Sequence, residues 1–249
     1  TEVCFVALKT GTFVNRGFLN GPVCPIYGFG ALVVLTALEP LRDHLLLLFL
    51  GSMALTSLLE YLTGLLLEKL FYQRWWDYSD EPFNLGGYIC LRFSLIWGVG
   101  ATLVVKLIHP AIAALVGVVP HTAGVVLAVP VTALFVCDLV ITVLGIAHMN
   151  QDIGRIDDIV RAMRTGSDIL AENIGGTALA VDRKVAGAAA RLDLARAELM
   201  DSRRRVALRL MKAFPHMHST RYTEGFERIR QWMEEEKRNR TGRKNDDAQ

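Results

Sequence analysis

Hydrophobic and polar positions divide the chain at about residue 150. Before that point, four apolar stretches each approach the ~20 residues that a helix needs to cross the hydrocarbon core of a bilayer. These stretches are residues 22–39, 44–66, 89–108 and 124–148. A further charge-free segment, 110–122, either prolongs the third helix or dips into the membrane as a re-entrant piece. The pattern therefore predicts an all-α, multi-pass transmembrane helical bundle over residues 1–150.

The remaining residues are predicted to form a polar helical tail. Residues 151–212 contain no proline, and their apolar positions approach a heptad-like stripe. This segment is predicted to be one long helix, forming a coiled coil between subunits, or a helical hairpin folding on itself. A second helix is predicted within 213–240, and the charged end, 241–249, is typical of a disordered tail.

Composition and charge strengthen this division. The mean hydropathy of the 249 residues is +0.32, which is high for a soluble protein. Residues 1–150 carry 7 basic and 9 acidic side chains, whereas the rest carries 20 basic and 16 acidic ones. Because basic residues collect on the cytoplasmic side of a membrane, the tail is predicted to be cytoplasmic. The four cysteines form no CxxC pair, and no spacing predicts a metal or cofactor site.

The apolar half contains a candidate internal repeat. An offset of 66 residues places Glu2 on Glu68 and Cys24 on Cys90, each cysteine at the start of an apolar stretch. The match predicts two parallel repeats within 1–150, each made of a helix, a cytoplasmic loop and a returning helix. Coincidence in a sequence of low diversity is the alternative. The repeat also predicts a further helix ending at Glu2, so that the natural protein would have at least five spans.

The densest polar cluster lies between the second and third stretches. Its aromatic residues fit an interfacial belt or a stacking surface; they are Trp75, Trp76 and Tyr78. Asp77 and Asn84 stand beside them and could bind a cation, hold Arg74 or Arg92, or contact a polar substrate. The neighbouring Gly86 and Gly87 predict a defined, non-helical loop.

Ionisable side chains also fall inside the predicted spans, where they are costly and commonly functional. Glu60 lies two turns before Glu68, so both carboxylates are close to one helical face. Asp138 interrupts the fourth stretch, and Arg92 lies about one turn into the third. Two explanations remain open: an interhelical ion pair of Arg92 with Glu60 or Asp138, or a cation or substrate site at the bundle centre.

Several motifs together resemble a known family. They are residues 15–30, 59–64 with Glu68, 76–79, 81–85 and 89–98. This pattern is similar to the putative ABC-transporter type IV permease family of bacterial membrane proteins, over about residues 1–148. Family members have a helix before the equivalent of Glu2. Gly86 stands where the family commonly has Asn, and the resemblance supplies no established catalytic residues.

The resemblance implies a permease-like membrane subunit of a bacterial transport system. The sequence contains no GxxxxGK[ST] motif, so an ATPase would be a separate chain. One alternative is a membrane-embedded enzyme that acts on a lipid or lipid-linked head group at the cytoplasmic face; another is a scaffold that recruits partners through its tail. The expected location is the bacterial inner membrane. Expected partners are membrane lipids, the ATPase and a second copy of the chain through the tail, rather than nucleic acid.

Overall fold

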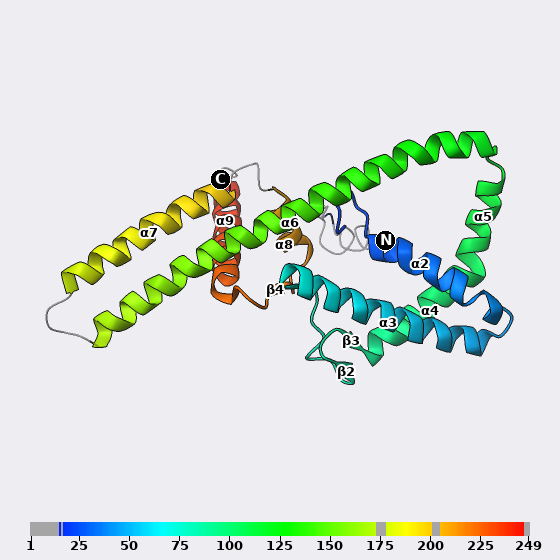
Figure 1. The fold of residues 1–249 in the computed structure, drawn as a ribbon, viewed down its shortest axis with the longest axis horizontal. Coiled ribbons are helices and arrows are strands. Elements are labelled where there is room, and N and C mark those ends of the chain that lie inside the picture. Colours follow the sequence, from blue (N-terminus) through cyan, green and yellow to red (C-terminus); the bar gives the residue numbers. More distant parts are fainter. Residues whose placement is uncertain (1–14, 16, 173–177, 201–204, 247–249) are drawn as a thin grey trace. The chain divides into compact units, whose positions relative to one another are not determined.

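The computed structural model describes residues 15, 17–172, 178–200 and 205–246 (Figure 1). Its helices and short strands follow one another in chain order: α2 (Pro25–Ala37), η1 (Glu39–Leu41), α3 (Leu45–Phe71), β1 (Gln73–Arg74), β2 (Asn84–Leu85), β3 (Ile89–Cys90), α4 (Leu91–Leu103), η2 (Val104–Ile108), α5 (His109–Gly117), α6 (His121–Glu172), α7 (Ala178–Met200), α8 (Arg205–Ala213), β4 (His218–Ser219) and α9 (Thr223–Asp246). The all-α fold class is confirmed.

Three of these helical segments are long and apolar enough to cross a membrane: Leu45–Phe71, Leu91–Gly117 and His121–Thr165. The first predicted span is shorter than expected, because its helix covers only Pro25–Ala37. At 1.5 Å per residue α2 is about 20 Å long, against ~30 Å of bilayer core. Much of the apolar surface of the spans is exposed, as lipid-facing side chains are.

Proline explains the irregular third span. Pro110 has no N–H, and its ring would crowd the carbonyl four residues earlier in a regular α-helix. The chain responds with a π-helical segment, η2, directly before α5. The span nevertheless continues to Gly117. Residues 110–117 therefore prolong the third helix, which decides between the two alternatives left open by the sequence.

The chain forms two compact units. The first comprises Thr1–Leu70, Arg74–Val143 and Lys212–Met217. Its apolar core is formed by α2, α3 and η2, where Val34, Leu38, Leu48 and Val105 are buried together. Glycine allows α4 to approach α3 closely, since a Cβ on Gly98 would lie 2.9 Å from the Cβ of Met53.

The second unit comprises Phe71–Gln73, Leu144–Met211 and His218–Gln249. Residues at helical spacing on α6 are buried, and apolar side chains from α8 and α9 are buried as well; they are Ile146, Met149, Ile153, Ile156, Leu210, Phe226, Ile229 and Trp232. The buried Asp157 accepts the backbone N–H of Gly225 at 2.8 Å, which fixes the start of α9 beside α6.

The tail differs from its sequence prediction in detail. The predicted division at residue 150 falls within α6, which runs without a break from His121 to Glu172. After it, α7 runs in the opposite direction (Figure 1), which favours the hairpin over a single long helix. The C-terminal helix α9 extends to Asp246, past its predicted end at residue 240. Most of the heptad-like side chains lie outside the residues whose side chains the structure describes.

Candidate functional site

The loop between α3 and α4 has a defined path, as its glycines predict. Strands β2 and β3 pair antiparallel, with Leu85 opposite Ile89. Gly86 and Gly87 in the turn have φ values of +61° and +74°, which residues with a Cβ rarely adopt. Gly87 is also tightly enclosed, because a Cβ there would lie 2.5 Å from Asp77 Oδ1.

Two of the predicted ligand residues hold this loop together. Asn84 Nδ2 donates to the carbonyls of Ser79 and Glu81, and Asn84 Oδ1 accepts from the Gly87 N–H. Asp77 Oδ1 accepts from the backbone N–H of Ser79 at 2.9 Å and from its hydroxyl at 2.5 Å. These contacts give Asp77 and Asn84 a structural role in shaping the turn.

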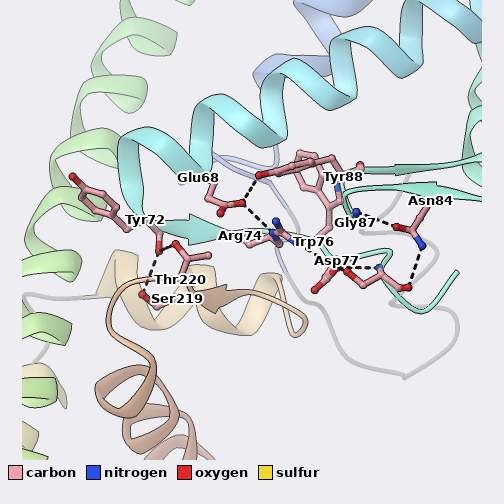
Figure 2. A network of polar contacts seen from close by, with 11 residues as sticks. Glu68, Tyr72, Arg74, Trp76, Asp77, Asn84, Gly87, Tyr88, Ser219 and Thr220 are labelled. Carbon is pink, nitrogen blue, oxygen red and sulfur yellow. Dashed lines mark hydrogen bonds and ion pairs between the residues drawn. The ribbon is translucent and has the colours of Figure 1, made fainter. Parts of the chain in front are cut away.

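A second network ties the loop to the end of α3 (Figure 2). Glu68 Oε2 accepts from Arg74 Nε at 3.0 Å and from the Tyr88 hydroxyl at 2.7 Å. The Arg74 guanidinium also lies 4.6 Å from the centre of the Tyr88 ring. Trp76 Nε1 donates to the Tyr88 carbonyl at 2.9 Å. One carboxylate at the end of α3 therefore sets the position of the loop.

Protonation in this network follows from its geometry. The pKa of Tyr88 is raised, first because its hydroxyl donates to Glu68 and then because of burial. Burial alone would lower the pKa of Arg74. Hydrogen bonds with Glu68 and Tyr88 and the Glu68 charge raise this pKa by more than burial lowers it, so the net shift is upward. At physiological pH Tyr88 therefore stays protonated and Arg74 stays charged.

The predicted ion pairs of Arg92 do not form. Arg92 pairs with Glu81 at 3.3 Å, and its side chain is 68% exposed. Arg92 is the second residue of α4, and it reaches the neighbouring loop instead of Glu60 and Asp138, the carboxylates within the spans. Arg74 Nη1 also lies 3.7 Å from Asp77 Oδ1, so loop acids contact both arginines, Arg74 and Arg92, as one of the sequence alternatives proposed.

Asp138 anchors a different loop, which precedes α2. Its Oδ1 accepts from the Asn20 backbone N–H at 3.0 Å and from Asn20 Nδ2 at 2.8 Å. Its Oδ2 accepts from the Gly21 N–H at 2.9 Å. The contact joins residues 118 positions apart, and sequence reasoning missed it. The sequence did contain a signal for this contact: Asp138 is a lone acid in an apolar span, and Asn20-Gly21 is a turn-forming pair inside a family motif.

Glu60 is a half-buried residue of the first unit, and aromatic side chains lie beside it. Its Oε1 accepts from the Tyr78 hydroxyl at 3.2 Å, and the Trp97 indole lies near the carboxylate. The Tyr78 ring stacks on Phe93, with centroids 4.8 Å apart. Glu60 Oε2 is buried and makes no hydrogen bond with the described residues.

The three aromatic residues predicted for a belt take separate roles. Trp75 is buried and packs against Phe18 and Phe214, with ring centroids 5.2 and 5.0 Å away. Trp76 holds the loop carbonyl, and Tyr78 contacts Glu60. Trp75 is thus a core residue, because aromatic partners distant in sequence cover it. Among the described residues, no group of three or more His, Cys, Asp or Glu side chains could hold a metal ion.

A family comparison now adds to this geometry. The family model described as "Putative ABC-transporter type IV" matches residues 1–143. The chain belongs to this family. The matched region ends at Val143, where the α6 portion of the first compact unit also ends. No curated protein and no solved structure matches the chain. Family and apolar helices together indicate a transport-related membrane protein.

Proposed function

We propose that the chain is a permease-like membrane subunit of a bacterial transport system, with ATP hydrolysis on a separate chain. The observation that carries this proposal is the position of Glu60: a carboxylate within a membrane-spanning helix of the family region, with one oxygen buried and without a hydrogen bond to described residues. Ionisable groups at such positions commonly mark substrate or ion pathways.

The orientation is part of the proposal. With 20 basic residues after position 150, the tail would lie in the cytoplasm, and the loop that holds Asp77 and Asn84 would face the same side. The inner membrane is then the expected location. A separate ATPase would approach from the cytoplasm, where α9 carries many charged side chains.

The alternatives receive less support from the geometry. A head-group enzyme would need polar groups that reach a substrate, whereas Asp77 and Asn84 are engaged in shaping their own loop. A scaffold would use the second unit, which lies outside the family match except for Phe71–Gln73. Neither alternative explains the carboxylate of Glu60 within the span.

The deciding experiment is purification of the tagged full-length protein from its native bacterium in mild detergent. Co-purifying proteins and lipids would be quantified by mass spectrometry, with an unrelated multi-pass protein carrying the same tag as the control. The proposal expects one ATPase in a fixed ratio to the chain. Absence of any ATPase together with one strongly enriched lipid would overturn it in favour of the enzyme.

A further inference from the structure

We infer that Glu60 and the aromatic side chains around it form a binding site for an organic ammonium cation. The carboxylate is well inside the membrane region: Glu60 precedes Glu68 by two helical turns, or ~12 Å at 1.5 Å per residue. A lone carboxylate at such a depth is costly unless a positive charge or a proton accompanies it. Among the described residues, no Lys or Arg forms an ion pair with Glu60.

Aromatic rings from three parts of the first unit form a series of ring contacts beside this carboxylate. Tyr78, from the loop, donates to Glu60 and stacks on Phe93 of α4. Trp97 lies one turn after Phe93 on the same helix and near the carboxylate. Trp97 also packs against Tyr27 of α2, with ring centroids 5.6 Å apart.

This composition selects the chemical class of the ligand. Aromatic faces attract cations through their quadrupoles, most strongly when water is excluded, and Trp is the most effective ring. The carboxylate supplies the compensating charge through Oε2, which makes no hydrogen bond with described residues. A hard metal ion would instead require about six oxygen ligands, and the described surroundings offer mainly a carboxylate, a phenol oxygen and aromatic rings.

The inference deepens the proposed function and rests on it for its biological meaning, since it names the substrate class of the permease. An ammonium group held between Glu60 and the rings would replace part of its hydration with ring faces and one carboxylate oxygen. The same site would discriminate against neutral molecules of equal size, because they gain neither interaction.

The test measures binding of tetramethylammonium to the full-length protein in lipid nanodiscs, by isothermal titration calorimetry. The neutral probe of similar shape is tert-butanol. We expect saturable binding of the cation, no measurable binding of the alcohol, and an affinity at least about tenfold weaker in Glu60→Gln, which keeps the side-chain shape. Equal affinity of wild type and Glu60→Gln would overturn the inference, as would equal binding of both probes.

Aromatic variants distinguish a specific loss of cation binding from a general folding defect. Trp97→Phe keeps a ring and should lose less affinity than Trp97→Leu, whereas Phe83→Leu changes an aromatic side chain that is 83% exposed and should lose none. Identical losses in Trp97→Phe and Trp97→Leu would contradict cation–π binding. If an ATPase co-purifies but the cation does not bind, the permease role stands and the ammonium site is rejected.

Discussion

The loops that precede α2 and α4 offer an instructive comparison. Both helices begin directly after a cysteine with extended backbone, Cys24 and Cys90, and their first and last residues lie 66 positions apart. Their loops, however, are held in different ways. Asp138, on the distant helix α6, holds the first loop, whereas Asp77, Asn84 and Glu68 hold the second from nearby positions.

Similar helix starts can therefore depend on different parts of the chain. The second loop is fixed by contacts within about twenty residues, so it can take shape as α3 and α4 form. The first loop needs α6 in place before its Asn20 and Gly21 donors are satisfied. The matching helix boundaries agree with the predicted repeat, which remains a prediction because residues 1–14 and 16 lie outside the described part.

The largest effect is expected at the turn of the second loop. In Gly87→Ala, the new Cβ would meet Asp77 Oδ1 and Ser79 Oγ at 2.5 and 2.6 Å, at a φ of +74°. Left-handed backbone and steric overlap together should cost roughly 2–4 kcal/mol of unfolding free energy. Thermal unfolding in detergent would measure this cost. Gly28→Ala is the control, because a Cβ at Gly28 meets nothing within 4 Å; similar losses in both variants would refute the argument.

The first loop should be sensitive to its distant anchor. Asp138→Ala removes the acceptor of two backbone N–H groups and of Asn20 Nδ2, and should cost about 2 kcal/mol. Thermal unfolding again gives the measurement, and the exposed Asp43, mutated to Ala, is the control. A double-mutant cycle with Asn20→Ala should show non-additivity. Strict additivity would mean that Asp138 does not act through Asn20.

A smaller effect is expected at the tyrosine that links the second loop to α3. Tyr88→Phe removes the hydroxyl that donates to Glu68 and should cost about 1 kcal/mol. Since the pKa of Tyr88 is raised in the folded protein, this contribution should be constant below about pH 10 and decline as the pH rises through the folded pKa. Unfolding of wild type and variant at a series of pH values tests both points. A difference that grows above pH 10 would contradict the assignment.

The smallest effect should come from Arg92→Ala. The pair between Arg92 and Glu81 is exposed on the arginine side, so its loss should cost roughly 0.2–1 kcal/mol at low salt and less at high salt. Unfolding at two ionic strengths would show this. A large, salt-independent loss would mean that Arg92 takes part in an interior ion pair after all.

Much of the architecture could be predicted from the sequence. The apolar runs predicted the three long spans, and Gly86 with Gly87 indicated the turn before α4. These features depend on residues close together in the chain. The short first span and the π-helical segment were not predicted, because they depend on how the backbone accommodates Cys24, Pro25 and Pro110 at particular positions.

The candidate site was predicted as a set of residues but not as an arrangement. The sequence identified Glu60, Glu68, Asp77, Asn84, Arg92 and Asp138 as the polar groups of interest. It could not assign their partners, and it offered Arg92 as the partner of Glu60 or Asp138. In the structure Arg92 forms an ion pair with Glu81, and Tyr78 and Trp97 lie beside Glu60.

Hydropathy and turn residues were enough to predict that this chain is helical, that its first part belongs in a membrane and where its polar loop lies. Only the tertiary structure decided that Asp138 holds Asn20 and that Trp75 is enclosed by Phe18 and Phe214. The reason is physical. Hydropathy and turn chemistry act over a few residues, whereas the pairing of side chains up to 118 positions apart depends on which helix faces come together.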